Sequence, residues 1–456
     1  MAKRPHIVAV PYPAQGHVKP LLSLSYKLAA HGIKVTFVNT KMIHERVISS
    51  LLDDDKEALE QSGIKLESVD DGLEGEKNPF DAEIFTQAIR RMMPTQLRDL
   101  IERINICNKD EQVTCVIADA TLGWILEVAE IFGVEKVGFL PFGPAGLAMF
   151  ITCIPKLIED GIMDSITGSI PENEQIRISK DIPSWSNRDL MWTSPGDEKL
   201  QKVFFECCLT VKETAENVDL LLCNTFYELD IFASNLIPKM MPIGPLQIER
   251  NSPSSGNFWV EDTSCLSWLD SQLPASVIYV SFGSTGVFNQ EQFNELALGL
   301  ELSRKPFLWV VREGINLNYP EGFIENVTHR GKIVHWAPQR RVLGHPAIGC
   351  FLSHCGWNSI MEGLISGVPF LCWPYFADQW HNQKYICDIW KCGLRVNCDE
   401  NGIRSRHEIN MKIQKLFSDS IMKVNALKLK DLAEESVSKG GSSYMNLDKF
   451  INHIKY

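Results

Sequence analysis

A short apolar run turns directly into a helical pattern at residues 349–359, GCFLSHCGWNS. Its apolar first half predicts a buried strand, and Gly356 allows the backbone to turn tightly after that strand. We expect Asn358 or Ser359 to cap the following helix, whose first N–H groups and positive dipole end then face outward. Such a helix start binds phosphate. His354, at the edge of the turn, can donate a hydrogen bond to a phosphate oxygen.

Two further side chains around this stretch suit a nucleotide. Glu362, one turn along the predicted helix, could accept hydrogen bonds from the vicinal hydroxyls of a ribose. Trp336, at the end of another predicted strand, offers a flat face for a base. The alternative is that Trp336 and Trp357 are core aromatics and that the polar residues only cap the helix. Their joint occurrence at strand ends favours the nucleotide site.

Short apolar strands alternate with helical patterns in both halves of the chain. The first half opens with a strand at 6–11, a glycine-containing turn at 12–17, a helix at 20–30 and a strand at 34–39. Similar strands are predicted at 113–118, 134–139, 276–282, 307–311, 332–335, 349–353 and 369–373, with a helix at 290–303. The pattern predicts the α/β class, with two doubly wound parallel sheets and ligands at the carboxyl ends of the strands.

A connector rich in Pro, Ser, Asn and Gly separates the two halves between residues 244 and 262. We therefore expect an N-terminal domain at 1–245, a linker at 246–262 and a second domain at 263–440. After the glycines at 440 and 441, residues 441–456 are expected to form a terminal helix that packs back on the N-terminal domain.

The composition of the 456 residues is that of a folded, acidic protein. Apolar residues make up 45% and charged residues 22%. The net charge of 45 − 57 = −12 disfavours nucleic acid and anionic membranes as partners. Thirteen cysteines without a CxxC pattern predict reduced thiols and a cytoplasmic protein. We expect a monomer whose partners are small molecules.

Two segments could be mistaken for targeting or membrane signals. The opening residues are interrupted by Pro11, Pro13 and Gly16, which disfavours a signal peptide. The charge-free stretch 137–154 approaches the length of a membrane span, but its prolines and glycines predict a buried strand, a loop and a helix.

A histidine and an aspartate follow two predicted strands of the first half. His17 lies in the turn after the first strand, and Asp119 comes just after strand 113–118, so both belong to one edge of the sheet. An imidazole there could take a proton from a substrate hydroxyl, and the carboxylate could hold the ring and stabilise the imidazolium. The alternatives are an inert loop histidine and an aspartate that caps a helix from Leu122 onward.

The 44-residue stretch from Trp336 to Gln379 resembles the plant secondary-product glycosyltransferase (PSPG) box of family 1 UDP-sugar-dependent glycosyltransferases. Further matches are Pro13-Ala-Gln-Gly16-His17, the strand and turn from Val280 to Ser284, and Gly440-Gly-Ser-Ser443, so the resemblance extends over the whole chain. It implies a GT-B fold of two facing Rossmann-like domains with the active site in the cleft. The first domain then binds the acceptor and the second binds the UDP-sugar.

The resemblance gives each matching position a part of the donor. Trp336 would stack on uracil, near the backbone of Ala337 and the side chain of Gln339, and Glu362 would hold the ribose hydroxyls. The diphosphate would be held by Ser284, His354, Asn358 and Ser359. The sugar would face Trp357, Asp378 and Gln379. In this family, tryptophan at the position of Trp357 together with glutamine at the end of the box points to UDP-glucose.

The resemblance also places the family's catalytic histidine at His17 and its supporting aspartate at Asp119. We expect the acceptor oxygen to displace UDP from C1 of an α-linked sugar, giving a β-glucoside. General-base assistance of this kind is worth about 10² to 10⁴ in rate. No DxD motif occurs at the nucleotide site, so we expect no metal and UDP-glucose as co-substrate. A zinc site would need other spacings than those of Cys350, His354, Cys355 and Cys372.

The acceptor is the least specified part of the reaction. Irregular apolar segments at 80–93, 142–154 and 182–205 are expected to expose aromatic and methionine side chains to a flat, lipophilic ligand, although Met92 and Met93 could be helix core. We expect a hydroxyl or carboxyl of a flavonoid or other phenolic, with a terpenoid, or another UDP-sugar, as the alternative. The predicted acceptor contacts are Gly16, Phe142, Trp185, Met191 and Phe376.

Two other classes of protein share parts of this pattern. A nicotinamide or flavin oxidoreductase would have the same sheets, but the chain contains no GxGxxG motif. A catalytically silent sugar-nucleotide-binding protein would keep the 336–379 box. The presence of both His17 and Asp119 favours an enzyme.

Overall fold

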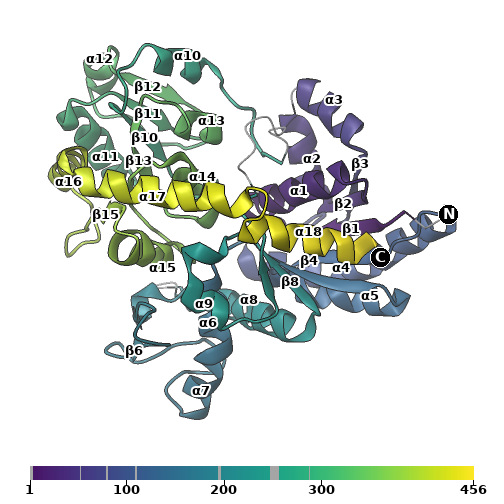
Figure 1. The fold of residues 1–456 in the computed structure, drawn as a ribbon. Helices are drawn as coiled ribbons and strands as arrows, with labels where there is room; N and C mark the ends of the chain where they lie inside the picture. Colours follow the sequence, from purple (N-terminus) through teal and green to yellow (C-terminus); the bar gives the residue numbers. More distant parts are fainter. Residues whose placement is uncertain are drawn as a thin grey trace. The chain divides into compact units, whose positions relative to one another are not determined.

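The chain folds as two compact units (Figure 1). Unit 1 comprises residues 1–260 and 435–456, and unit 2 comprises residues 261–434. The computed structural model describes residues 4–51, 53–78, 81–107, 110–193, 197–246, 256–286 and 288–455. The predicted linker at 246–262 falls mostly on residues 247–255, which lie outside the described residues.

Unit 1 is built on a seven-stranded parallel sheet with the order β3-β2-β1-β4-β5-β8-β9. Its strands are β1 (His6–Val10), β2 (Lys34–Thr40), β3 (Ile64–Val69), β4 (Cys115–Asp119), β5 (Glu135–Leu140), β8 (Leu220–Cys223) and β9 (Met240–Pro242). Every residue of β1 and β4 is buried, because helices cover both faces of a parallel sheet and leave no polar side. A short antiparallel pair, β6 (Gln175–Ile176) and β7 (Trp185–Ser186), lies outside this sheet.

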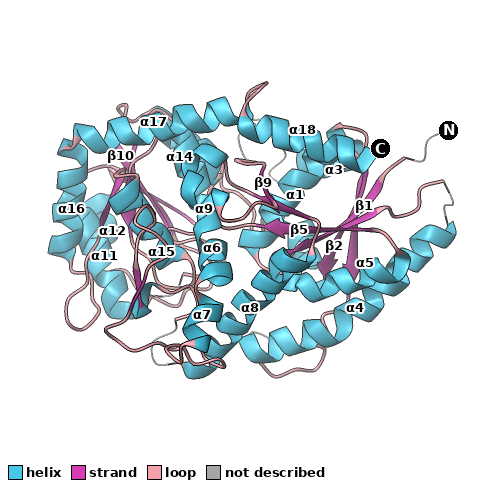
Figure 2. Cartoon of the chain, turned by 60° about the horizontal axis from the view of Figure 1, so that its bottom comes forward, coloured by secondary structure: helices cyan, strands magenta, loops and turns pink. Residues whose placement is uncertain are grey.

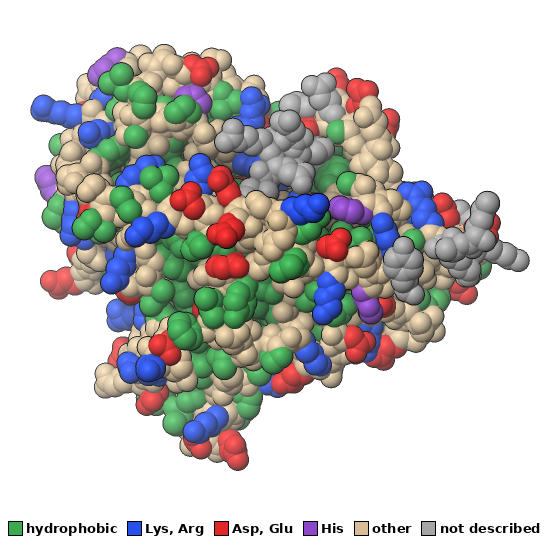
Figure 3. Space-filling view, in the orientation of Figure 1, with side chains coloured by type: hydrophobic (Ala, Val, Ile, Leu, Met, Phe, Trp, Pro, Cys, Tyr) green, Lys and Arg blue, Asp and Glu red, His purple; other side chains and the backbone are tan. Residues whose placement is uncertain are grey.

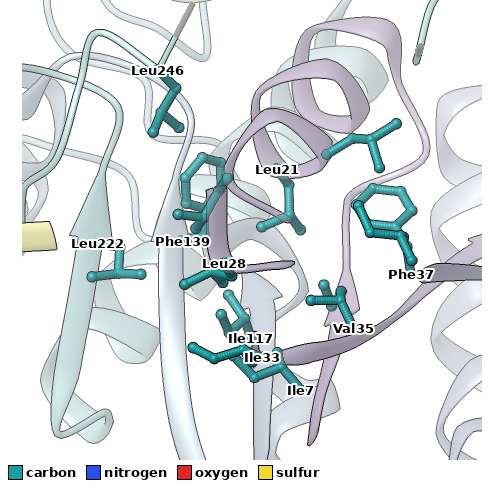
Figure 4. Close-up of a cluster of buried hydrophobic side chains, with 14 of the residues drawn as sticks. Ile7, Leu21, Leu28, Ile33, Val35, Phe37, Ile117, Phe139, Leu222 and Leu246 are labelled. Carbon is teal, nitrogen blue, oxygen red and sulfur yellow. The ribbon is translucent and has the colours of Figure 1, made fainter. Parts of the chain in front are cut away.

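Helices of unit 1 cover this sheet. The helices of the unit are α1 (Gln15–Ala30), α2 (Lys41–Ser50), α3 (Asp53–Ser62), α4 (Ala82–Cys107), the 3₁₀ segment η1 (Ala120–Ile125), α5 (Leu126–Phe132), α6 (Pro144–Thr152), α7 (Ile154–Glu159), α8 (Glu198–Asn217), α9 (Ile231–Asn235) and α18 (Ser442–Lys455). Among them, α6, α7, α8 and α9 pack mainly on one another and on neighbouring helices. Leu21 and Leu28 of α1 meet Ile7, Ile117 and Phe139 of the sheet in one buried cluster (Figure 4). The terminal helix α18 packs beside β9 and adds two apolar side chains to the same cluster.

Unit 2 contains a six-stranded parallel sheet with the order β12-β11-β10-β13-β14-β15, and helices surround it (Figure 2). Its strands are β10 (Val277–Ser281), β11 (Phe307–Val310), β12 (Gly331–Val334), β13 (Ile348–Ser353), β14 (Phe370–Cys372) and β15 (Gly393–Arg395). The helices are α10 (Ser264–Asp270), α11 (Gln290–Ser303), α12 (Phe323–Val327), α13 (Gln339–Leu343), α14 (Trp357–Ser366), α15 (Gln379–Lys384), α16 (Arg406–Ser418) and α17 (Ser420–Val437). The boundary with unit 1 falls inside α17.

The predicted α/β class with two parallel sheets is confirmed, and the first helix begins earlier than predicted. The sequence predicts an amphipathic helix over residues 20–30, whereas α1 begins at Gln15 and Pro20 lies inside it. The charge-free stretch 137–154 forms β5 and then α6, as predicted. In the part of the chain that the structure describes, no helix is both long enough and apolar enough to span a bilayer.

The surface drawn in Figure 3 is mixed in charge. Acidic and basic side chains of the described residues are interspersed there, without an extended basic patch on that face. All thirteen cysteines carry free thiols, and nine of them are buried.

Candidate active site

His17 and Asp119 meet where the strand order of unit 1 reverses. β1 pairs with β4, with Val10 opposite Ala118, while the chain continues from β1 to β2 on the other side. Helix α1 starts just after β1 and carries His17 in its first turn. Asp119 is the last residue of β4. In open parallel sheets this reversal point is the usual place for a ligand.

The two side chains form a short hydrogen bond. Nδ1 of His17 lies 2.8 Å from Oδ2 of Asp119, whose side chain is fully buried, whereas the imidazole is 25% exposed. The other carboxylate oxygen accepts from the backbone N–H of Thr121 at 2.9 Å and from its hydroxyl at 2.6 Å. Asp119 therefore both caps η1 and holds His17, so the two interpretations of this aspartate apply together. With Nδ1 as the donor to the carboxylate, Nε2 is the basic nitrogen of the ring.

His17 sits on a helix and not in the predicted loop, which fixes its backbone more firmly. The Tyr12 ring lies against it, with the ring centroids 5.1 Å apart. Tyr12 and Thr121 also line a small pocket between α4, η1 and α8, together with Thr86, Ile89, Leu122 and Trp124 among others. The sequence motifs do not include Tyr12 or Thr121, although Tyr12 immediately precedes Pro13 and Thr121 lies two residues after Asp119.

In unit 2 the predicted donor residues follow the carboxyl ends of four strands of the sheet. Ser284 follows β10, Trp336 follows β12, His354 follows β13 and Asp378 follows β14. β10 and β13 are neighbours, with Ser281 opposite Ser353, and the chain leaves β10 toward β11 on the other side. This is the reversal point of the second sheet.

The imidazole of His354 is enclosed by two glycines. A Cβ atom at Gly283 would lie 2.6 Å from Nε2 of His354, and one at Gly356 would lie 2.5 Å from it, so both positions need glycine. The ring of Tyr375 stacks beside the imidazole with centroids 6.0 Å apart. Burial lowers the pKa of His354 to about 4. At neutral pH this residue can therefore bind an anion by a hydrogen bond and not by its charge.

The N-cap of helix α14 lies two or three residues before the predicted one. Gly356 is its N-cap, and no side chain caps the helix there. The prediction that Asn358 or Ser359 caps α14 is wrong, because both lie inside its first turn. Trp357 is the first helical residue and is buried. The hydroxyl of Ser359 instead accepts from Nε2 of Gln339 at 2.9 Å.

Gln339 joins the predicted uridine-binding residues into one network. Its Nε2 also donates to Oε2 of Glu362 at 2.7 Å, and its Oε1 accepts from the Tyr279 hydroxyl at 3.1 Å. Glu362 is only 1% exposed. A carboxylate can accept several hydrogen bonds, so one amide donor does not exhaust its capacity. Ala337, two residues before Gln339 in the sequence, is buried, and Trp336 is half-buried.

The predicted sugar-facing residues are held by contacts within unit 2. Oδ2 of Asp378 accepts from Nδ2 of Asn382 at 2.7 Å, and the same nitrogen lies 3.0 Å from the carbonyl of Cys355. Oε1 of Gln379 accepts from the backbone N–H groups of residues 375 and 376 at 3.0 and 3.3 Å. Their contact with a sugar stays a prediction.

The predicted acceptor residues are placed unevenly. Gly16 is exposed in the first turn of α1, and Phe142 is half-buried before α6. Phe376 belongs to unit 2, where its ring stacks on Tyr375 at 5.2 Å. Trp185 is fully buried and Met191 is 8% exposed.

The expectation that segment 182–205 exposes its large side chains is wrong for these residues. Trp192 packs between Phe150 and Phe205, at centroid distances of 6.1 and 5.2 Å, and its Nε1 donates to the carbonyl of Gly168. Met191 packs against Gly146, where a Cβ atom would lie 2.6 Å from its sulfur. The segment thus contributes to the core of unit 1, which sequence periodicity alone did not indicate.

Comparisons with known proteins agree with this architecture. Residues 191–439 match the family described as UDP-glucoronosyl and UDP-glucosyl transferase, and residues 5–67 match the N-terminal domain of glycosyltransferases. The chain is 43% identical to UDP-glycosyltransferase 83A1 of Arabidopsis thaliana, over 99% of this chain and 97% of the relative. It is 34% identical to 7-deoxyloganetin glucosyltransferase of Catharanthus roseus, over 100% and 97% of the two chains.

A solved structure is similar over the same extent. UGT2 of Phytolacca americana, complexed with UDP-2fluoro-glucose and pterostilbene, aligns with a TM-score of 0.83 at 26% identity, covering 99% of this chain and 100% of that one. The two parallel-sheet units and these matches define a glycosyltransferase of the GT-B class. More narrowly, the chain belongs to the plant family 1 UDP-glycosyltransferases, enzymes that act on secondary metabolites.

In the described part of the chain, no group of three or more His, Cys, Asp or Glu side chains is arranged to hold a metal ion.

Proposed function

We propose that this enzyme transfers glucose from UDP-glucose to a hydroxyl group of a small lipophilic plant metabolite and forms a β-glucoside. The observation that carries the proposal is the 2.8 Å hydrogen bond between His17 and the buried Asp119 at the reversal point of the first sheet. A nucleotide-binding protein without catalytic activity would have no need for this pair.

In the proposed reaction, Nε2 of His17 takes the proton of the acceptor hydroxyl. The acceptor oxygen forms a bond to C1 of glucose on the face opposite UDP, and the bond between C1 and the phosphate oxygen breaks with its electron pair going to UDP. The imidazolium that forms is stabilised by the Asp119 carboxylate and later releases its proton to solvent. The configuration at C1 is inverted by this single displacement.

On the donor side, we assign the diphosphate to the start of α14, with Ser284, His354, Asn358 and Ser359 as side-chain partners. The N–H groups of the first turn and the helix dipole favour an anion there. Neutral His354 adds a hydrogen bond. The uracil is assigned to Trp336, the ribose to Gln339 and Glu362, and the sugar to Trp357, Asp378 and Gln379. The proposed mechanism uses no metal ion.

The choice of glucose rests on Trp357 and Gln379 and on relatives named as glucosyltransferases. For the acceptor we propose a phenolic such as a flavonoid, which pterostilbene in the similar structure supports. A terpenoid alcohol is the second candidate, supported by the 7-deoxyloganetin glucosyltransferases among the relatives. We further propose that the enzyme acts as a monomer in the cytoplasm.

The test is to incubate the purified protein, without added metal, with UDP-glucose and a panel of flavonoids, simple phenols and terpenoids. A mass gain of one hexose on any acceptor supports the transferase and ranks the acceptor classes, and parallel reactions with UDP-galactose and UDP-xylose test the donor. His17→Ala should lose transfer while UDP still binds. Transfer at the wild-type rate in this variant would remove His17 from the mechanism, and UDP binding without transfer to any acceptor would favour the silent protein.

A further inference from the structure

The loop after β10, residues 282–286, is held by two side chains that come from elsewhere in unit 2. The loop contains Ser284, which the proposed function assigns to the diphosphate. Arg312 reaches it from the end of β11, and Tyr375 reaches it from the segment after β14. Neither residue was selected from the sequence, because their partners are backbone carbonyls far away in the chain.

Arg312 binds two carbonyls of this loop at once. Its Nη1 donates to the carbonyl of Ser284, and its Nη2 donates to the carbonyl of Gly286 at 2.6 Å. The planar fork of a guanidinium suits such a pair of acceptors, whereas a lysine offers a single point of charge. No ion pair joins Arg312 to a carboxylate of the described residues. Among the described residues of unit 2, no carboxylate therefore neutralises the positive charge of Arg312.

Tyr375 binds the same loop from another direction. Its hydroxyl donates to the carbonyl of Phe282 at 3.0 Å and lies 3.0 Å from the hydroxyl of Thr285. Its ring stacks beside His354, and its backbone N–H donates to Gln379. One residue therefore ties the loop to two other predicted donor residues.

We propose that Arg312 and Tyr375 are positioning residues for the donor diphosphate. Together they donate hydrogen bonds to the backbone carbonyls of residues 282, 284 and 286. A carbonyl oxygen that accepts such a hydrogen bond points toward its donor and not toward a bound phosphate. This fixes the loop with its hydrogen-bond donors available for phosphate before UDP-glucose arrives, and it adds one positive charge beside the site. The inference rests on the proposed function, since it assumes that the diphosphate lies against Ser284.

The test compares the affinity for UDP with the affinity for uridine, which lacks the diphosphate. Arg312→Met and Arg312→Lys should weaken UDP binding about tenfold or more, and Tyr375→Phe about three- to fivefold, with uridine affinity within about twofold of wild type. In turnover, KM for UDP-glucose should rise while KM for the acceptor stays constant. Thermal unfolding is measured for every variant.

The chain offers matched controls for both residues. Arg330 also donates to backbone carbonyls, those of Glu301 and Leu300, and burial lowers its pKa as it does for Arg312, but it precedes β12 at the opposite edge of the sheet. Arg330→Met should lower thermal stability and leave UDP affinity unchanged. Tyr227→Phe removes a comparable hydroxyl contact, to Asn235 in unit 1, and should not affect UDP.

Three results would overturn the proposal. Full recovery of UDP affinity in Arg312→Lys would show that only charge matters, and equal losses for UDP and uridine would show a general structural defect. An equal loss of UDP affinity in Arg330→Met would show that the effect does not depend on contact with the loop at 282–286. If the wild-type protein binds uridine but not UDP, the assigned diphosphate site itself fails, and the proposed function fails with it.

Discussion

Asp119→Asn is the sharpest test of the candidate catalytic pair, because it changes one charge and almost no volume. The carboxylate is fully buried and lies 2.8 Å from Nδ1 of His17. Once His17 is protonated, two unit charges about 4 Å apart attract each other by about 4 kcal/mol at an effective dielectric constant of about 20. Losing that attraction corresponds to about 10³ in rate. Asparagine also presents an N–H to the ring, which would favour the tautomer that cannot accept the proton at Nε2.

The assay is single-turnover glucosylation at saturating donor, with UDP affinity measured separately. Turnover should fall by about 10³, and UDP affinity should stay within about twofold of wild type, because the aspartate belongs to unit 1. A matched control is Asp270→Asn, which removes the same charge beside another histidine, His345, whose Nε2 lies 3.1 Å from Oδ1 of Asp270 in unit 2. The reasoning is refuted if Asp119→Asn keeps turnover within about threefold of wild type, or if Asp270→Asn loses as much.

The remaining predictions concern unit 2. Gly283→Ala should lower the free energy of unfolding by about 2 kcal/mol or more and weaken UDP binding. The reason is that φ is +67° at this position and that a Cβ atom would meet the ring of His354. Chemical denaturation that shows no loss of stability would contradict this. The lowered pKa of His354, about 4 instead of 6.5, means that the unfolded chain binds more protons between these pH values. Stability should therefore fall by up to about 3 kcal/mol as the pH drops from 6.5 to 4, and urea titrations should show a flatter decline for His354→Gln. Glu362→Ala should weaken UDP binding about tenfold and also abolish the preference for UDP over 2′-deoxy-UDP; a preserved preference would place the ribose elsewhere.

The sequence was sufficient to predict the elements that are buried on both sides. Strands such as β1, β4 and β13 are continuous apolar runs, since helices cover both faces of each sheet. Helix α11 covers the predicted residues 290–303 because Asn289 caps it and its apolar positions repeat with the helical period. The strands β3 and β9 of unit 1 are among those that were not predicted. In β3, exposed and half-buried residues interrupt the apolar run, and β9 is only three residues long.

The parts that could not be predicted depend on contacts between segments far apart in the chain. Asn358 and Ser359 are good capping residues by type, but Gly356 begins α14 earlier because its backbone is already extended there. Trp185 is fully buried, which no local pattern of its segment shows. Arg312 and Tyr375 hold backbone carbonyls, and a carbonyl has no residue type that a motif could detect.

The two candidate sites follow from the same structural principle, applied separately in each unit. A parallel sheet whose strand order reverses leaves an opening at its carboxyl edge, and the residues just after the two central strands line it. In unit 1 these residues are His17 and Asp119, and Thr121 holds the aspartate in turn. In unit 2 the loop after β10 and the turn after β13 are fixed by hydrogen bonds and by glycines that admit the His354 ring. Because neighbouring residues already orient these groups, binding and proton transfer need little rearrangement, and the effect of losing a supporting residue should be found in the step that its partner performs.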